Sequence, residues 1–373
     1  MKHRNYDILV VGAGPAGSAA ALTAAGLGAK VLVAERRDVI GVPVRCAEYI
    51  PRALLGELPF RDRAFVVQSV KAMRTVLPDG DVRETRAPGL IIRRDRFDQR
   101  LAECARAEGA EIRTGVRAVS HENGEVLLKQ ARGGTIRIRP AVIIGADGPH
   151  SIVGKWMGLR TRRRIPGIQV RVPLAGPMDH TVVCFHPKIF GAYGWLFPRG
   201  DEANVGLALA GGDFSAGALK AALDGFVGRW VHEGRIRAAP RKSMFGWIPT
   251  APIDCVVKGN MMLAGDAAGH AHPITGAGIA NAILAGRLAG KWAGEAVKRG
   301  DLSALQGYAG ELREELGETL RHGDQRRRIL ERHWDRLSEI LPYCWVAFRE
   351  YFQEIPDRFA IKREATGNCH DNT

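Results

Sequence analysis

The chain has 373 residues, of which 46% are hydrophobic and 25% are charged. This balance is typical of globular proteins and excludes a disordered chain, a collagen helix and a coiled-coil rod. Lys and Arg outnumber Asp and Glu by 54 to 40, a formal net charge of +14, which suits an anionic cofactor, an anionic lipid surface, nucleic acid or simply a solvated surface.

The first 34 residues predict a strand–turn–helix–strand unit. Residues 7–11 form a short apolar run, residues 12–17 a glycine-rich turn, residues 18–27 an alanine-rich helix and residues 30–34 a second apolar run. Basic residues 2–4 ahead of this stretch resemble a signal peptide, but Asp7 and the regular glycines favour the folded unit. No stretch predicts a membrane-spanning helix.

Further along the chain, the pattern of apolar and polar residues changes from segment to segment. Two more apolar strands, residues 141–144 and 261–264, end in turns rich in glycine and aspartate. Residues 60–90 and 115–140 alternate apolar with charged residues, which is typical of half-exposed antiparallel strands. Residues 165–250 contain several short strands, and residues 300–350 predict helices.

We therefore predict an α/β fold in which two domains interleave. A Rossmann-like nucleotide-binding domain takes residues 1–58, 90–160 and 252–300. An antiparallel-sheet substrate domain takes residues 59–89 and 161–251, and residues 301–373 form a C-terminal helical region. Six widely spaced cysteines resemble neither a disulfide framework nor a zinc site, so we expect reduced thiols, no metal and a cytoplasmic location. They are Cys46, Cys104, Cys184, Cys255, Cys344 and Cys369.

The first turn contains the GxGxxG pattern of dinucleotide-binding proteins. Gly12 forms the tight turn, Gly14 lets the backbone approach a pyrophosphate and Gly17 packs the helix on the strand, with Pro15 and Ala16 between them. Glu35 ends the second strand, where a carboxylate accepts hydrogen bonds from a ribose diol. The pattern predicts an adenine dinucleotide.

Three later motifs favour FAD over NAD. Residues 145–151, which include Asp147, resemble the DG motif of the para-hydroxybenzoate hydroxylase class of flavoproteins; residues 265–269 and 273–279 resemble its GD motif, and residues 94–98 its Arg-x-x-Phe-Asp. The resemblance implies that Asp266 binds the ribityl chain and that Arg94 reaches the cofactor. A helix N-terminus beside the flavin stabilises the negative charge of the reduced ring. We expect His270 and His272 to be structural.

Two motifs narrow the family. Residues 43–48, Pro-Val-Arg-Cys-Ala-Glu, and residues 193–198, Tyr-Gly-Trp-Leu-Phe-Pro, resemble segments of geranylgeranyl reductases. This resemblance covers residues 5–300. Many members have glycine where this chain has Ala47, and alanine would be strained if that position takes a positive φ.

These resemblances imply a set of site residues. Cys46 is a candidate proton donor or a packing residue. Tyr193, Trp195 and Phe197 alternate along an expected strand and share one face, which forms either a substrate channel or an ordinary sheet core. We expect catalytic roles for Cys46, Tyr193 and Trp195, and substrate contacts from Tyr193, Trp195, Phe197 and Glu48. The expected cofactor contacts are Gly12, Gly14, Pro15, Ala16, Gly17, Glu35, Arg36, Arg45, Cys46, Ala47, Arg94, Val116, Asp147, Gly265, Asp266, Pro273, Gly276, Ala277, Gly278 and Ile279.

The expected activity is FAD-dependent reduction of carbon–carbon double bonds in a polyprenyl chain. The resemblance implies hydride transfer from reduced flavin, which an external donor, a reduced carrier protein or NAD(P)H, has reduced. The alternatives are an NAD(P)H- and FAD-dependent aromatic hydroxylase and a flavoprotein electron relay to quinone.

Basic clusters at residues 160–164 and 325–328 lack the interleaved aromatics of a nucleic-acid platform, so we expect no nucleic acid. A solvated face is the main interpretation of these clusters and an anionic headgroup site the alternative, with peripheral contact at an anionic membrane as an option. Apolar residues within 329–352 predict either a helix pair on the substrate domain or an interfacial membrane face.

Overall fold

A six-stranded, largely parallel sheet forms one half of the computed structural model, which describes residues 6–159, 163–211, 215–240 and 242–360. Its strand order is β16-β17-β10-β1-β2-β6. The bounds are β1 (Ile8–Val11), β2 (Val31–Ala34), β6 (Glu111–Arg113), β10 (Val142–Gly145), β16 (Val257–Lys258) and β17 (Met261–Leu263).

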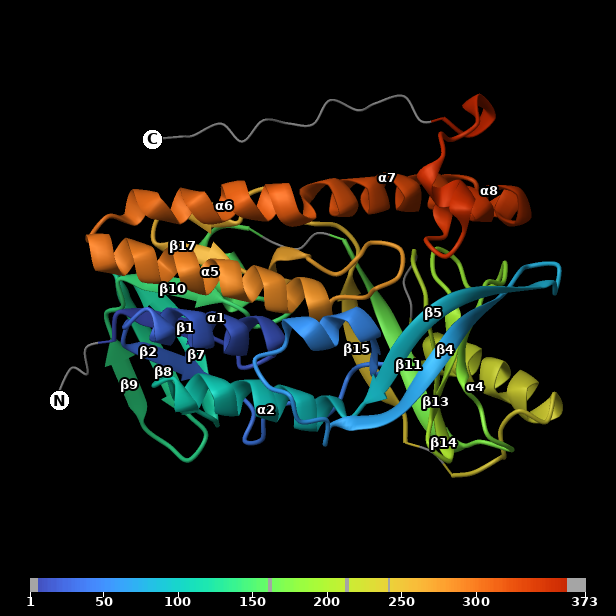
Figure 1. The fold of residues 1–373 in the computed structure, drawn as a ribbon, viewed down its shortest axis with the longest axis horizontal. Helices are drawn as coiled ribbons and strands as arrows, with labels where there is room; N and C mark the ends of the chain where they lie inside the picture. The colour runs from blue at the N-terminus through green and yellow to red at the C-terminus, as the bar shows by residue number, and fades with distance from the viewer. Residues whose placement is uncertain (1–5, 160–162, 212–214, 241, 361–373) are drawn as a thin grey trace.

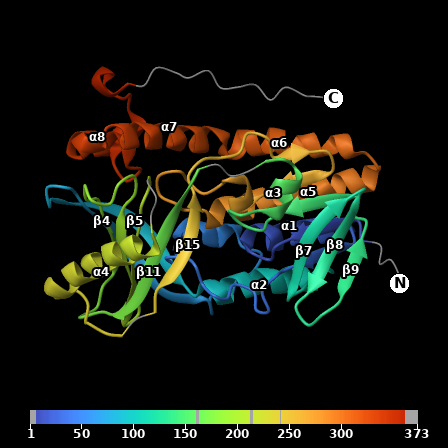
Figure 2. The same ribbon diagram turned by 180° about the vertical axis from the view of Figure 1, so that it is seen from behind.

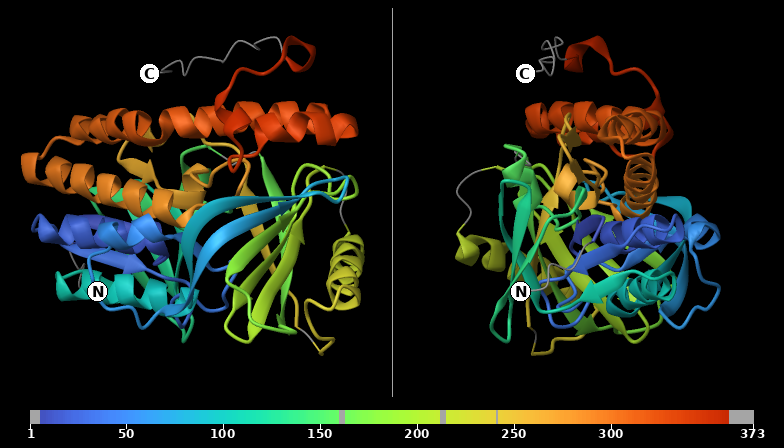
Figure 3. Two further views of the ribbon diagram at one scale, coloured as in Figure 1. Left: turned by 45° about the vertical axis from the view of Figure 1, so that its right-hand side comes forward. Right: turned by 90° about the vertical axis from the view of Figure 1, so that its left-hand side faces the viewer.

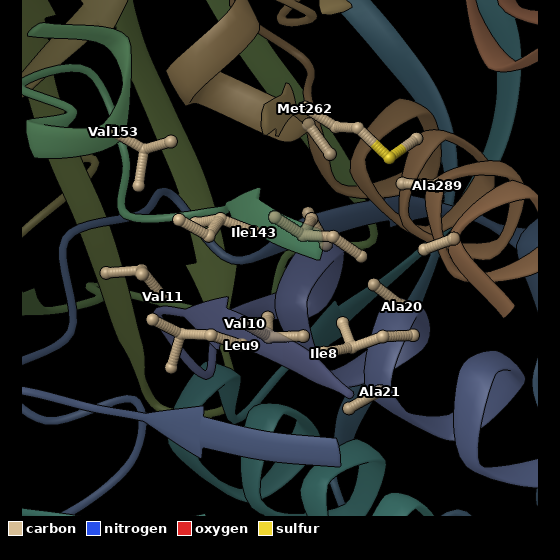
Figure 4. Close-up of a cluster of buried hydrophobic side chains, with 14 of the residues drawn as sticks. Ile8, Leu9, Val10, Val11, Ala20, Ala21, Ile143, Val153, Met262 and Ala289 are labelled. Carbon is tan, nitrogen blue, oxygen red and sulfur yellow. The ribbon is translucent and has the colours of Figure 1, made fainter. Parts of the chain in front are cut away.

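Helices cover this first sheet, and glycines let two of them pack closely. The covering helices are α1 (Pro15–Gly26), α2 (Arg94–Ala107) and α5 (Ile279–Arg299), as Figure 1 shows. A Cβ on Gly286 or Gly290 of α5 would lie within 2.3 Å of a backbone oxygen of α1, so α1 and α5 touch backbone to backbone. Figure 4 shows Ile8, Ala20 and Ala289 in the resulting core cluster.

A separate three-stranded sheet and a short helix complete this half of the molecule. The strands are β7 (Val116–Glu122), β8 (Glu125–Gln130) and β9 (Thr135–Ile138), and the helix is α3 (Ile152–Trp156). In Figure 2 these strands lie at the end of the molecule away from the second sheet.

The second sheet has eight strands in the order β15-β11-β14-β13-β12-β4-β5-β3. The sheet is curved, and α4 (Ala216–His232) packs on its outer face (Figure 3). The bounds are β3 (Tyr49–Pro51), β4 (Val66–Val76), β5 (Val82–Ile92), β11 (Arg164–Pro173), β12 (His180–Cys184), β13 (Gly194–Arg199), β14 (Glu202–Ala208) and β15 (Met244–Pro249).

The C-terminal helices bridge the two halves along one edge of the molecule (Figure 1). α6 (Gln306–Leu312) continues through a π-helical turn, η4 (Arg313–Gly317), into α7 (Glu318–Arg332), and α8 (Leu337–Cys344) and the 3₁₀ turn η6 (Arg349–Phe352) follow. Within the described part of the chain, no helix is long and apolar enough to cross a membrane.

The α/β fold with a parallel sheet, an antiparallel sheet and C-terminal helices is confirmed. Three details differ from the expectations. Helix α1 begins at Pro15, inside the expected turn, and α4 was not expected. The expectation of a solvated face at residues 325–328 is wrong for Arg326 and Arg327, which are 5% and 2% exposed, because α7 turns them toward the rest of the protein.

The apolar residues near the end of the chain pack in the core. Trp334, Leu337, Ile340, Leu341, Trp345 and Phe348 join one buried cluster with the second sheet, whereas Phe352 is exposed. Of the other expectations, Cys369 and residues 2–4 and 160–162 lie outside the described residues, and the described cysteines are all free thiols.

Candidate functional site

A cavity of about 1510 Å³ runs from the carboxyl ends of the first sheet's strands to the inner face of the second sheet. It exceeds the roughly 300–1000 Å³ of ordinary small-molecule pockets. All the expected cofactor residues except Gly17 and Pro273 line it, and so do Cys46, Glu48, Tyr193, Trp195 and Phe197. Residues expected to bind the cofactor and residues expected to bind substrate therefore share one space.

The glycine-rich turn has the geometry that a pyrophosphate requires. Gly12 has a φ of +100°, and a Cβ there would lie 2.5 Å from the carbonyl oxygen of Ala146. A Cβ on Gly17 would lie 1.9 Å from the carbonyl oxygen of Gly12, which explains why this glycine packs behind the turn rather than lining the cavity. Gly14 meets nothing within 4 Å, so its backbone is open to a ligand at the start of α1.

Glu35 holds the same turn from the end of β2. One carboxylate oxygen accepts from the backbone N–H of Ala13 at 2.8 Å and the other from that of Arg37 at 2.9 Å. Each oxygen keeps a second lone pair, so the carboxylate can still accept from a ribose hydroxyl. Glu35 is thus both a support for the turn and a candidate ligand group.

Two exposed arginines lie at the rim of the nucleotide end. Arg36 follows Glu35 directly, and Arg45 precedes the cysteine loop. Neither pairs with a carboxylate among the residues that the structure describes, so both are available to a phosphate. Ala47 and Val116 line the cavity beside them.

The two motif aspartates differ in how their carboxylates are used. Asp147 accepts from the hydroxyl of Ser151 at 2.6 Å and the backbone N–H of Ile152 at 2.5 Å, so it fastens the start of α3. In the described part of the chain no hydrogen bond reaches the carboxylate of Asp266. Burial raises the pKa of Asp266, and Arg94 opposes that shift. A partly buried carboxylate without a partner suits hydroxyl donors such as those of a ribityl chain.

The segment after Asp266 forms a turn and then opens α5. Gly276 has a φ of +65°, and a Cβ there would lie 3.2 Å from Ile248 of β15. The free backbone amides at the start of α5, from Gly278 onward, lie at the cavity wall and favour negative charge there. Pro273 lies behind the wall, and its carbonyl accepts from Arg327 of α7 at 2.9 Å. The turn, the free carboxylate of Asp266 and this helix start together fit FAD.

Cys46 lies in a loop that two buried polar groups anchor. The backbone N–H of Glu48 donates to its Sγ at 3.2 Å, and Gln169 of β11 donates to its carbonyl at 2.8 Å. Burial raises the pKa of the Cys46 thiol, although the neighbouring guanidinium of Arg94 opposes the shift, so the thiol keeps its proton at neutral pH. Ala47 does not take a positive φ; Glu48 does, at 69°, so the expected strain falls one residue later.

The carboxylate of Glu48 is the centre of a buried network. One oxygen accepts from the backbone N–H of Arg94 at 3.0 Å, and the other accepts from Arg171 at 2.9 Å, Arg199 at 2.8 Å and Asn204 at 3.1 Å. The side chain is 0% exposed, although Glu48 is among the residues that line the cavity. Its contacts tie the cysteine loop to β11, β13 and β14, which is a supporting role, and the expected substrate contact stays a prediction.

Arg94 extends this network toward the cofactor end. Its Nε donates to Asp98 at 2.7 Å one helical turn later in α2. The carboxylate of Asp98 raises the pKa of Arg94 despite burial, so the guanidinium stays charged beside Cys46 and Asp266.

Tyr193, Trp195 and Phe197 form the aromatic wall of the cavity. Tyr193 lies just before β13, with its ring centroid 6.2 Å from that of Trp195. The indole N–H of Trp195 donates to Gln169 at 3.1 Å. A Cβ on Gly206 would lie 2.5 Å from the Trp195 ring, so this glycine makes room for the indole. The shared face is as expected, and the wall is both cavity surface and sheet core.

The C-terminal region adds residues that the sequence motifs did not indicate. Trp345 packs its ring 5.4 Å from Tyr193 and donates its N–H to Thr75 at 3.0 Å. Tyr351, Phe352 and His322 also line the cavity. The apolar residues within 329–352 predicted either packing on the substrate domain or an interfacial membrane face, and no local pattern indicates which of them reach the cavity.

Two family models match the chain. One described as FAD dependent oxidoreductase matches residues 7–41, and one described as FAD binding domain matches residues 69–186. The chain is 36% identical to a digeranylgeranylglycerophospholipid reductase of Methanothrix thermoacetophila over 90% of each chain. It is 33% identical to digeranylgeranylglycerophospholipid reductase 1 of Methanopyrus kandleri, over 84% of this chain and 88% of the relative.

Solved structures agree with the fold. A geranylgeranyl bacteriochlorophyll reductase-like protein of Thermoplasma acidophilum superposes with a TM-score of 0.82 at 29% identity, over 91% of each chain. The flavin-dependent halogenase CmlS superposes with a TM-score of 0.70 at 16% identity, over 95% of this chain and 71% of the halogenase. The second likeness concerns the fold alone.

Proposed function

The chain belongs to the digeranylgeranylglycerophospholipid reductase family of FAD-dependent oxidoreductases, and we propose that it reduces carbon–carbon double bonds in the geranylgeranyl chains of a glycerophospholipid. The observation that carries the proposal is the continuity of the cavity. One space joins the dinucleotide turn at Gly12–Gly17 to the aromatic wall of Tyr193, Trp195 and Phe197.

The cofactor end of the cavity is built to hold FAD in our proposal. Gly14 and the start of α1 receive the pyrophosphate, Glu35 the ribose and Asp266 the ribityl chain. The start of α5 stabilises the negative charge of the reduced ring. Bound FAD supplies a hydride that it has received from an external donor, a carrier protein or NAD(P)H.

The aromatic end addresses the difficulty of the reaction, which is that an isolated alkene accepts hydride poorly. Trp195 and Phe197 are 8% and 7% exposed, and their rings present a dry, apolar surface. Such a wall excludes water and holds a flexible prenyl chain in a limited set of positions. The hydrogen bond from Trp195 to Gln169, and from Gln169 to the Cys46 carbonyl, fixes the wall relative to the cysteine loop.

Cys46 is our candidate for the proton source. Its Sγ accepts from the backbone N–H of Glu48, which leaves the thiol proton free to be donated. The raised pKa keeps that proton in place until a strong base develops in the cavity. The Glu48 network contributes to this step only by holding the cysteine loop in position.

Peripheral contact with an anionic membrane is part of the proposal. A phospholipid substrate resides in a bilayer, so the cavity must open toward one. Phe352 is 77% exposed and lines the cavity, which marks an apolar point at its mouth. The net charge of +14 favours an anionic surface.

The proposal is tested by mass spectrometry of the lipid after incubation with the dithionite-reduced, FAD-loaded protein. We expect gains of two mass units for each double bond reduced. Substrate-coupled oxygen consumption with added NAD(P)H would instead indicate a hydroxylase. Fast quinone reduction with an unchanged lipid would indicate an electron relay, and either result would overturn the proposal.

A further inference from the structure

A continuous series of side chains leads from solvent to the aromatic wall. The ring of exposed Phe352 lies 5.1 Å from that of Tyr351, which lies 4.7 Å from the ring of His322 and 6.4 Å from that of His272. From His272 the series continues through Thr275, whose carbonyl accepts from the hydroxyl of Tyr193. We call His272, His322 and Tyr351 the polar collar, and it lies between the mouth and the apolar interior.

The collar presents a hydrogen-bond donor, the phenol of Tyr351, to the cavity. Nδ1 of His272 accepts from the backbone N–H groups of Ile274 and Thr275, each at 3.3 Å. A backbone N–H can only donate, so in the neutral ring the proton lies on Nε2. Nε2 is 3.4 Å from the Tyr351 hydroxyl. It donates to that oxygen and leaves the phenol proton of Tyr351 free for a ligand.

A buried cation supports the collar from behind. Arg326 is 5% exposed, its guanidinium stacks 5.9 Å from the Tyr351 ring, and its Nε donates to His322 at 3.1 Å. Its Nη2 donates to the carbonyl of Gln353, while its Nη1 is buried without a partner. Among the described residues no carboxylate pairs with Arg326. A buried charge without a counter-ion is costly. Arg326 does not itself line the cavity, so an anion held by the collar would offset that cost across the ring of Tyr351.

We propose that the polar collar, supported by Arg326, binds the phosphate of the lipid headgroup while the prenyl chains extend inward along the aromatic wall. This inference rests on the proposed function and adds a subsite to it. The order along the cavity suits an amphiphile that enters from a membrane, because the phosphate stops near the mouth and the apolar chains continue. Glu318 and Thr319, both exposed, border the same mouth, and the carboxylate of Glu318 is screened by water.

The test compares two lipids in detergent micelles with the FAD-loaded, dithionite-reduced protein. One is a geranylgeranyl glycerophospholipid and the other is the same diether without phosphate. In the wild type we expect a KM about tenfold lower for the phospholipid, the equivalent of one charge-assisted hydrogen bond. Tyr351→Phe and Arg326→Gln should bring the ratio of the two KM values close to one.

Arg328→Gln is the matched control. Arg328 belongs to the same helix and its side chain is 51% exposed, so this substitution removes one positive charge without touching the collar. It should preserve the wild-type ratio. A wild-type ratio near one, or a tenfold ratio that survives in both Tyr351→Phe and Arg326→Gln, would overturn the assignment. If neither lipid is reduced by the wild type, the proposed function itself fails.

A binding measurement covers the case in which Arg326→Gln does not fold. Histidine resonances of the FAD-loaded wild type are followed by NMR during titration with glycerol phosphate and, separately, with inorganic phosphate. We expect glycerol phosphate to shift the His272 and His322 signals in the wild type and not in Tyr351→Phe. No shift in the wild type, or equal shifts with inorganic phosphate at the same concentration, contradicts a site for the lipid-borne group.

Discussion

Trp195→Ala is the substitution that most directly separates lipid reduction from the other properties of the protein. Trp195 lies in the middle of the aromatic wall, 8% exposed, and its indole N–H donates to Gln169 at 3.1 Å. Loss of the indole widens the cavity beside the cysteine loop. The hydrogen bond of the indole goes to Gln169, which is not among the residues assigned to FAD, so we expect the variant to keep its flavin.

The size of the effect follows from the contacts. Replacement of a buried tryptophan by alanine costs about 3–5 kcal/mol, and the low end applies because one side of this ring already faces a cavity. We therefore expect the free energy of unfolding to fall by about 3 kcal/mol, including the loss of the bond to Gln169. A prenyl chain misplaced by about 1 Å loses on the order of 10²-fold in rate, which is our expectation for kcat in lipid reduction.

The assay measures two rates on the same sample, flavin reduction by dithionite at 450 nm and lipid reduction by mass spectrometry. Trp230→Ala is the matched control, because Trp230 of α4 is a 4%-exposed tryptophan on the opposite face of the same sheet. It should lose similar stability and keep the wild-type ratio of the two rates. The reasoning fails if Trp195→Ala retains normal lipid turnover, or if both variants lose lipid reduction equally.

Three further substitutions address the cofactor and the pH dependence. Asp266→Ala should weaken FAD binding at least tenfold, since its partly buried carboxylate has no partner in the described chain; fluorescence titration of the apoprotein measures this, with exposed Asp254→Ala as control. Glu35→Ala should also weaken FAD binding at least tenfold, because a charge-assisted hydrogen bond contributes about 1.5–3 kcal/mol and the Ala13 amide loses its acceptor. An unchanged Kd for FAD would place the ribose elsewhere. Burial lowers the pKa of His272 from 6.5 to about 4, so the unfolded chain takes up its proton first as the pH falls. The contribution of His272 to the free energy of unfolding is therefore complete above pH 6.5. As the pH falls from 6.5 to 4, the free energy of unfolding decreases by roughly 3 kcal/mol. Urea unfolding at pH 7 and pH 5 should show a flatter dependence in His272→Gln, and an equal slope in both proteins would contradict this assignment.

Local patterns predicted the parts of the site that depend on local geometry. The turn at Gly12–Gly17 needs glycine because of contacts within a few residues and with one neighbouring strand, and alternation in β13 places Trp195 and Phe197 on one face. Both features are set by spacing alone. They could be predicted from the sequence for that reason.

The supporting residues depend on contacts that spacing does not encode. Glu48 meets Arg171 and Arg199 across sequence separations of 123 and 151 residues, so its burial appears only when the second sheet is assembled. Arg326 and Arg327 look like a solvated basic run in sequence, yet α7 directs both inward, where Arg327 binds the carbonyls of Pro273 and Gly191. The polar collar unites the GD segment, α7 and η6, and no motif spans those three elements.

Burial sets the charge along the cavity in a way that matches an amphiphilic substrate. In the middle of the cavity the pKa of Cys46 and the pKa of Tyr193 are raised by desolvation, so both side chains are neutral at neutral pH. Positive charge lies at two places: Arg94, beside Cys46 and Asp266 toward the cofactor end, and Arg326 behind the collar. Neutral side chains such as those of Cys46 and Tyr193 hold water less strongly than charged ones do, so an alkene can displace solvent beside them. In our proposal the cofactor lies at one end and the headgroup at the other, so the length of chain between them sets the position of each double bond.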